Sequence, residues 1–382
     1  MKRLAAFLLV SLFLPLLASA QIPAITTWAA GMDTTASGPG ISSATGLTFR
    51  NKVRIAVGGI GFRFTFSNQN GTTPLTIGAA SAGASTEAED GTVSQSFALK
   101  FSGSSSVIIP AGGFVASDPI LLPTPKFSIF YVSTYVPSQT IARWTYHEIA
   151  KETNYVAAGD QTNALTMTGS TVTTSWWFLK SVEAETRVPV IVAIGDSITD
   201  GFKSTADVNA RWPDYLANNL WGRAAVANVG ISGNEILAST ASGGPSELAR
   251  EQNDVFDLAG VKYVIDLEGV NDIAHGTGTA DQIIAAKTTF IDQAHARGIR
   301  VYEATIMPAS ILNSAMNTVR ATVNTWIRTS GVPDGVVDFD TLMADPSNPL
   351  ILNPAYDSGD GIHPNDAGDK VMGDSINVNL IQ

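Results

Sequence analysis

Two short segments of the chain carry residue types that could together cleave an ester. The tripeptide Gly-Asp-Ser ends at Ser197, and a later turn contains Asp360 and His363. A serine hydroxyl is a weak nucleophile until a base removes its proton, and a carboxylate stabilises the imidazolium that results. We therefore expect Ser197 to be the nucleophile, His363 its base and Asp360 the residue that orients the base. Asp357 is an alternative to Asp360, because it precedes it closely in the chain.

His363 is preferred as the base after comparison of all 4 histidines. His147 lies in a β-rich region and His295 near the end of an expected helix, where positive charge suits the helix dipole, so we expect both to be structural. His275 is a second candidate, although no carboxylate at a short fixed spacing orients it. His363 shares a turn with a carboxylate. The alternative is a turn that only caps the last helix, with Pro364 at its first position.

Hydrogen-bond donors for a developing oxyanion are available in two other segments. Residues 230–234 form a glycine-rich turn after one expected strand, and Asn271 supplies a side-chain amide after the next. If these strands belong to one parallel sheet, their carboxyl ends lie at the edge where such sheets bind ligands.

Candidate substrate-binding residues flank the nucleophile in sequence. They are Asp196, Asn209, Arg211 and Trp212. Trp212 could stack on a sugar ring or cover an acyl group. Alternatively, the pair Trp-Pro at this point begins a helix whose apolar residues face the core.

The C-terminal half of the chain alternates continuous apolar runs with helical periods. A helix is expected after Asp281, a possible N-cap, with Gly298 as its stop signal. This order predicts a parallel sheet covered by helices. The expected strands are 188–194, 225–229, 263–267, 299–306 and 336–339.

The preceding region, from about residue 25 to 180, has short alternating runs separated by Gly, Ser, Asn and Pro. Phe62, Phe64 and Phe66 alternate with polar or small residues, as expected for one face of a strand in a sandwich core. We expect a jelly-roll-like β-sandwich domain over residues 21–184 and an α/β domain over residues 185–382.

Four segments carry recognisable motifs, and they lie at residues 195–201, 230–234, 269–272 and 360–364. Together they resemble the SGNH, or GDSL-type, esterase and lipase family. The resemblance implies Ser197 as nucleophile, with Asp360 and His363 completing the triad. It implies an oxyanion hole made by the amides of Ser197 and Gly233 and the side chain of Asn271. It also implies a flavodoxin-like three-layer α/β/α fold and no metal or organic cofactor. The resemblance covers about residues 188–382.

The N-terminus reads as an export signal. Lys2 and Arg3 precede an apolar run over residues 4–17, and Ala-Ser-Ala stands before Gln21. We expect residues 1–20 to be a cleaved signal peptide rather than a stable membrane anchor, because the run is shorter than the roughly 20 residues that span a bilayer. We therefore expect a secreted bacterial protein, periplasmic or extracellular.

Composition narrows the possible functions. The formal net charge of -11 and the lack of a basic cluster disfavour nucleic acid as a partner. The absence of cysteine excludes disulfides and thiolate catalysis. Only 15% of residues are charged and 45% are hydrophobic, so the chain can bury large cores.

The expected function is hydrolysis of a carboxylic ester, with a small acyl group such as acetyl on a polysaccharide or oligosaccharide as the substrate. The general plan resembles two-domain bacterial carbohydrate esterases. A lipase, lysophospholipase or thioesterase would use the same triad. A glycosidase using Asp266, Glu268 or Asp272 is another enzyme class, and a non-enzymatic glycan-binding surface protein is a third alternative.

Overall fold

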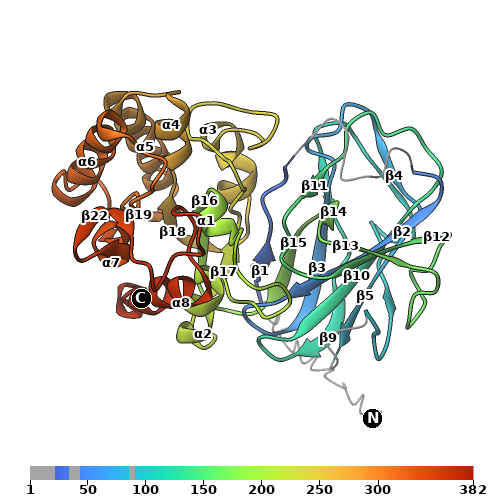
Figure 1. Ribbon diagram of the computed structural model, residues 1–382. Helices are drawn as coiled ribbons and strands as arrows, with labels where there is room; N and C mark the ends of the chain where they lie inside the picture. The colour runs from blue at the N-terminus through green and yellow to red at the C-terminus, as the bar shows by residue number, and fades with distance from the viewer. Residues whose placement is uncertain (1–21, 34–43, 86–90, 382) are drawn as a thin grey trace, which may run out of the picture.

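The computed structural model describes residues 22–33, 44–85 and 91–381, so the expected signal peptide over residues 1–20 lies outside the described residues. Figure 1 shows two halves side by side. A β half, made of the described residues up to 185, lies on the right, and a C-terminal half of strands and helices lies on the left. The predicted boundary between residues 184 and 185 falls at the C-terminal end of β15 (Leu179–Glu185).

A parallel sheet forms the centre of the C-terminal half. Most residues of its strands are buried and apolar, which is typical of a sheet covered on both faces. The first strand of this sheet in chain order, β16, lies between the second and the third, which is the flavodoxin-like order. The sheet order is β17 (Ala225–Asn228), β16 (Val190–Gly195), β18 (Val261–Leu267), β19 (Arg300–Ala304) and β20 (Gly335–Val337).

Helices lie on both sides of this sheet. In Figure 1, α3 (Glu247–Glu251), α4 (Val270–His275), α5 (Ala280–His295) and α6 (Ser314–Thr329) lie above it. Below it lie α2 (Trp212–Leu220) and α8 (Asp366–Ser375), and α7 (Phe339–Met343) contacts α8. The expected N-cap of α5 at Asp281 is wrong. Thr279 caps this helix instead, because its hydroxyl accepts a hydrogen bond from the amide of Gln282.

Short elements complete this half. The helix α1 (Ser197–Asp200) follows β16 directly, and the π-helix η1 (Gln252–Phe256) continues α3. A hairpin joins β21 (Ala344–Asp345) to β22 (Asn348–Leu352), and the 3-10 helix η2 (Val378–Leu380) lies near the C-terminus.

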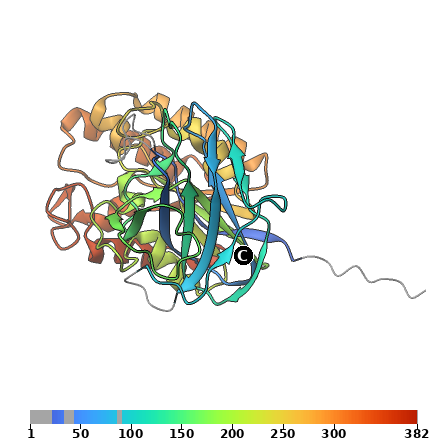
Figure 2. The same cartoon turned by 90° about the vertical axis from the view of Figure 1, so that its right-hand side faces the viewer.

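The β half contains two larger antiparallel sheets, and Figure 2 turns their strands toward the viewer. One contains β1 (Ala24–Ala29), β15, β3 (Gly59–Ser67), β8 (Phe114–Ala116) and β9 (Ile120–Thr124). The other contains β13 (Thr171–Thr173), β12 (Asn154–Ala158), β2 (Leu47–Arg54), β10 (Ile129–Val136), β5 (Ala79–Ser85) and β6 (Phe97–Ala98). Smaller pairs join β4 (Leu75–Ile77) to β7 (Val107–Ile109) and β11 (Tyr146–His147) to β14 (Trp176–Trp177).

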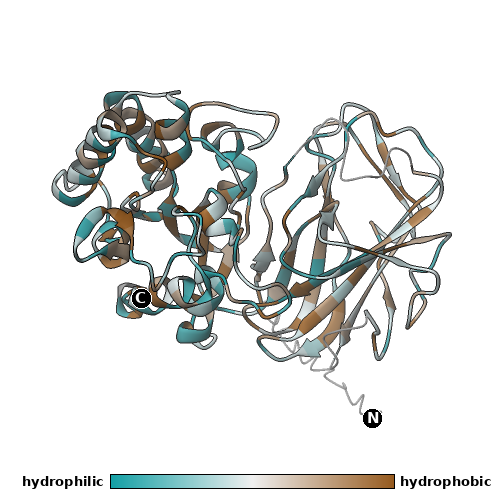
Figure 3. Ribbon diagram, in the orientation of Figure 1, coloured by the Kyte–Doolittle hydropathy of each residue, from teal (hydrophilic) through white to brown (hydrophobic). Residues whose placement is uncertain are grey.

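Aromatic side chains pack between the two larger sheets. Phe62 and Phe64 of β3 contact Phe130 of β10, with ring centroids 4.9 and 5.8 Å apart. The expectation that the alternating phenylalanines are core residues is confirmed, since Phe62, Phe64 and Phe66 are buried. The jelly-roll connectivity stays a prediction. Figure 3 shows hydrophobic residues along the strands of both halves and hydrophilic residues mainly on the outer helices and loops.

The two halves contact each other through buried polar groups as well as apolar ones. The Thr26 amide of β1 donates a hydrogen bond to the Ala259 carbonyl. Lys52 of β2 forms a 2.6 Å ion pair with Asp207, which lies between α1 and α2. The segment that follows the nucleophile is therefore held against the β half.

Candidate active site

Ser197 is positioned by a sharp turn at the carboxyl end of β16. Gly195 has φ +158°, and a Cβ there would lie 2.3 Å from the Leu267 carbonyl oxygen and 2.4 Å from the Thr199 hydroxyl, so only glycine fits. Asp196 caps α1 by accepting a hydrogen bond from the Ile198 amide at 2.9 Å. Ser197 is consequently the first residue of a helix that starts at the sheet edge.

The structure brings the three expected triad residues together in series. The Ser197 Oγ lies 2.8 Å from His363 Nε2, and His363 Nδ1 lies 2.8 Å from Asp360 Oδ2. Because a carboxylate only accepts, Nδ1 carries the proton in this arrangement and Nε2 can accept the serine proton. The long separation in sequence is bridged because the turn before α8 lies at the same sheet edge as α1.

Asp360, not Asp357, orients the histidine. Partial burial raises the pKa of Asp360, but hydrogen bonds from the His363 amide and ring and the Ile362 amide outweigh it and bring this pKa to about 2. Asp357 instead accepts from the amides of Gly359 and Gly361 at 2.9 and 3.0 Å. Asp357 thus shapes the turn, while Asp360 holds the imidazole.

The residues around the triad leave it accessible. The Phe202 ring lies 4.9 Å from the His363 ring, and Lys203 Nζ lies 3.8 Å from Asp360 Oδ2. The side chains of His363 and Asp360 are 15% and 30% exposed. The base and its carboxylate therefore lie near the protein surface.

The expected oxyanion donors occupy two segments that are tied to each other. Asn271, in α4, donates from its side chain to the Asn234 carbonyl at 2.9 Å. The Asp272 carboxylate accepts from the amides of Ile236 and Leu237. Within the described part of the chain, the amides of Ser197 and Gly233 have no hydrogen-bond acceptor. These two amides and the Asn271 side chain stay the predicted oxyanion hole.

Buried Arg250 links the turn over residues 230–234 to β16, the strand that precedes Ser197. Its guanidinium donates to the Asn234 side chain at 2.9 Å, the Val229 carbonyl at 2.6 Å and the Gly195 carbonyl at 3.1 Å. Sequence reasoning did not single out Arg250, since its role depends on carbonyls from three separate segments.

Three of the expected substrate contacts are wrong. Trp212 is 0% exposed and packs against Phe339, so it begins α2 and faces the core instead of stacking on a sugar. Arg211 is buried, pairs with Asp214 at 2.8 Å and lies over the Trp176 ring of the β half. Asp196 is buried as the helix cap. Burial raises the pKa of Asp196 to about 7.

Asn209 stays a predicted substrate contact. It lies in the segment between α1 and α2, is half-buried and has a left-handed backbone conformation with φ 54°. This conformation is one that asparagine tolerates better than most residues.

The other histidines pair with carboxylates that are distant in sequence. His275 lies 2.8 Å from Glu235, and His295 lies 2.7 Å from Asp334. His275 is not the base of Ser197, because the ring that contacts the Ser197 hydroxyl is that of His363. His147, which was expected to be structural, has a local contact with the Ile149 carbonyl at 3.1 Å, and its ring also crosses to the C-terminal half and contacts Asp200 at 3.0 Å.

The carboxylates of the glycosidase alternative are unavailable to a substrate. Asp266 is wholly buried and pairs with Lys287 at 2.6 Å, while Asp272 is wholly buried and accepts two backbone amides. Glu268 is also buried. A glycosidic bond therefore cannot reach them in this fold.

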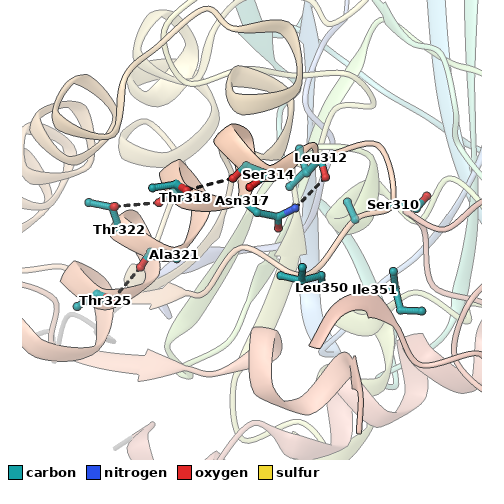
Figure 4. Close-up of a pocket in the computed structure, with 11 residues that line it drawn as sticks. Ser310, Leu312, Ser314, Asn317, Thr318, Ala321, Thr322, Thr325, Leu350 and Ile351 are labelled. Carbon is teal, nitrogen blue, oxygen red and sulfur yellow. Dashed lines mark hydrogen bonds between the residues drawn. The ribbon is translucent and has the colours of Figure 1, made fainter. Parts of the chain in front are cut away.

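A groove of about 750 Å³ begins beside the catalytic turn (Figure 4). At one end, the Ser310 amide donates to the Gly361 carbonyl at 2.8 Å. Along α6, the hydroxyls of Thr318, Thr322 and Thr325 donate to carbonyls of their own helix, which leaves their methyl groups for the groove. Leu350 and Ile351 of β22 form the opposite wall, so the lining is largely apolar.

A parallel sheet with a serine at one strand end, joined to a histidine and a carboxylate, defines the class of an α/β serine hydrolase. Residues 193–371 match the GDSL-like lipase/acylhydrolase family. The protein is an ester-hydrolysing enzyme. No curated protein matches the chain.

Solved structures resemble about half of the chain at low identity. A lipolytic protein of the G-D-S-L family from Desulfitobacterium hafniense is 21% identical, with 49% of this chain and 96% of that one covered and a TM-score of 0.40. An aryl esterase from M. smegmatis is 16% identical, with 51% and 100% covered and a TM-score of 0.42. A catalytic mutant of an acetylxylan esterase from Geobacillus stearothermophilus is 18% identical, with 50% and 94% covered and a TM-score of 0.40.

Proposed function

We propose that this chain is a secreted serine esterase that removes acetyl or another short acyl group from a carbohydrate through an acyl-enzyme intermediate. The observation that carries the proposal is the unbroken series Ser197 Oγ, His363 ring and Asp360 carboxylate, with 2.8 Å at each contact. The expected leader over residues 1–20 supports secretion.

In the proposed reaction, Ser197 Oγ attacks the ester carbonyl carbon while His363 Nε2 takes its proton. The Gly233 and Ser197 amides and the Asn271 side chain receive the oxyanion. His363 then gives the proton to the leaving sugar oxygen as the carbon–oxygen bond breaks. Water activated by the same imidazole releases the carboxylic acid and restores the serine.

The position of the triad favours an ester carried on a large molecule. The His363 and Asp360 side chains are partly exposed, so a bulky sugar polymer can reach the serine without entering the protein core. Among the described residues no helix is both long enough and apolar enough to cross a membrane.

The test is acid release from acetylated xylan, acetylated pectin and a phospholipid, measured in parallel for the native chain and for Ser197→Ala. We expect acetate from at least one acetylated glycan, and at least about a thousandfold lower rate for the variant, as for nucleophile removal in serine hydrolases. Equal release by the variant, or release from the phospholipid alone, would contradict the proposal.

A longer acyl group is a second candidate, and the methyl-lined groove beside the Ser310–Gly361 contact favours it. An apolar chain laid along α6 would gain free energy by covering these methyl groups. An enzyme of this kind would be a lipase, lysophospholipase or thioesterase with the same triad.

A further inference from the structure

The carboxylate of Asp200 lies between the two halves of the molecule. One oxygen contacts the His147 ring of the β half at 3.0 Å. The other accepts hydrogen bonds from the Ser232 amide at 3.1 Å and the Ser232 hydroxyl at 2.6 Å. A single side chain at the end of α1 thus joins the β half to the turn that carries Gly233.

His147 is a buried cation in this arrangement. Its Nδ1 faces the Gly31 carbonyl at 2.8 Å, and its Nε2 faces Asp200 and the Ile149 carbonyl. All three partners only accept, so both ring nitrogens carry protons. Burial lowers the pKa of His147, but the charges of Asp200 and Asp33 and the hydrogen bond to Asp200 outweigh it and raise this pKa to about 9.

The pair is sealed from water. His147 and Asp200 are 2% and 1% exposed, and Asp33 lies 3.9 Å from the imidazole. Charged hydrogen bonds in such a place are stronger and more directional than those in water. The position of the Asp200 carboxylate is therefore fixed by a residue of the β half.

The oxyanion turn is held by the same carboxylate. Ser232 directly precedes Gly233, so its two hydrogen bonds to Asp200 hold the residue next to the Gly233 amide. The turn also packs tightly on α1, since a Cβ on Gly230 would lie 2.4 Å from the Asp200 amide nitrogen. Nucleophile helix and oxyanion turn consequently share one anchor.

We propose that His147 is a positioning residue for catalysis: it holds Asp200, and through Ser232 it aims the Gly233 amide at the oxyanion. This inference rests on the proposed function. It gives the β half a part in the chemistry, as the source of the cation that fixes the oxyanion turn.

The test compares two matched variants of the full chain, Asp200→Asn and Asp207→Asn. Both aspartates lie after Ser197 and pair with a buried cation of the β half, His147 or Lys52, but only Asp200 contacts the oxyanion turn. With p-nitrophenyl acetate we expect Asp200→Asn to lower kcat at least about tenfold with KM within about twofold, because a misaimed donor loses part of the roughly hundredfold effect of an oxyanion contact.

Asp207→Asn should lower the melting temperature but keep kcat within about twofold, since no reacting group depends on it. Ser232→Ala leaves the buried ion pair of His147 and Asp200 intact, and it replaces Asp200→Asn in the test if that variant does not fold. It should lower kcat about threefold or more, with KM again unchanged. In a folded Asp200→Asn background it should add no further loss, because both changes act through the same carboxylate.

Retention of the native kcat by both Ser232→Ala and any folded Asp200→Asn would overturn the inference. So would a KM rise in place of a kcat loss. Failure of the proposed function looks different: the native chain itself would release no acid, and a fluorophosphonate probe would not label Ser197.

Discussion

The two aspartates of the catalytic turn have different roles at the scale of single residues. Asp360 accepts from the His363 ring and two amides, whereas Asp357 accepts from the amides of Gly359 and Gly361. The first sets the tautomer of the base, and the second sets the path of the backbone.

Asp360→Asn is expected to lower kcat by about 10³- to 10⁴-fold, because an amide in this place leaves the imidazole in the wrong tautomer. Kinetics with p-nitrophenyl acetate at pH 7 would check this. Asp357→Asn is the matched control, and it should act mainly on thermal stability. A larger kcat loss in Asp357→Asn than in Asp360→Asn would reverse the assignment.

At the scale of elements, helix α6 and strand β22 form the walls of the groove (Figure 4). The groove starts at the catalytic turn, where the Ser310 amide donates to the Gly361 carbonyl. The α6 wall is largely apolar beyond Ser314 and Asn317, because its threonine hydroxyls donate to carbonyls of their own helix. The groove therefore suits a chain of methylene groups better than a sugar.

Ala321→Trp should narrow this groove. If acyl chains lie there, hydrolysis of p-nitrophenyl octanoate should fall about tenfold or more while hydrolysis of the acetate stays unchanged, since each buried CH₂ contributes about 0.8 kcal/mol. Ala285→Trp, an exposed alanine on α5 outside the groove, is the control. Equal chain-length profiles in the native chain and Ala321→Trp would exclude the groove as an acyl site.

At the scale of the whole molecule, buried titratable groups make stability depend on pH. Burial raises the pKa values of Asp33, Asp196 and Glu152 to about 7 and that of Glu303 to about 8. The folded chain therefore keeps protons that the unfolded chain loses near pH 4. The pKa of His147, at about 9, extends this effect to higher pH. By linkage, the free energy of unfolding falls as pH rises through this range.

Other carboxylates limit stability in acid. Burial raises the pKa values of Asp338 and Asp360, but hydrogen bonds from Arg328 and His363 outweigh it and bring both to about 2, so this stabilisation is lost as pH falls below about 4. We expect the highest melting temperature near pH 5 and a fall of at least about 4 °C by pH 9.

Scanning calorimetry between pH 3 and pH 9 would measure this profile. His147→Gln should show a smaller fall between pH 7 and pH 9 than the native chain, because it lacks the group that titrates there. A melting temperature that rises steadily from pH 5 to pH 9 would contradict this account.

The sequence by itself determined those parts of the site that are local in the chain. Asp360 and His363 share one turn, and Ser197 and Asn271 follow apolar runs that are unmistakable as buried strands. Periodicity and short spacing carry such information because the groups are linked by a few backbone bonds. The parallel sheet and its strands could be predicted for the same reason.

Only the tertiary structure decided which distant groups meet. Trp212 is a core residue, because it packs against Phe339 of α7. The path of one turn decides that Asp360, and not Asp357, holds the His363 ring. The pairing of His147 with Asp200 joins residues 53 positions apart in different halves of the molecule. No local pattern encodes such a contact, because it exists only once two independently patterned cores pack against each other.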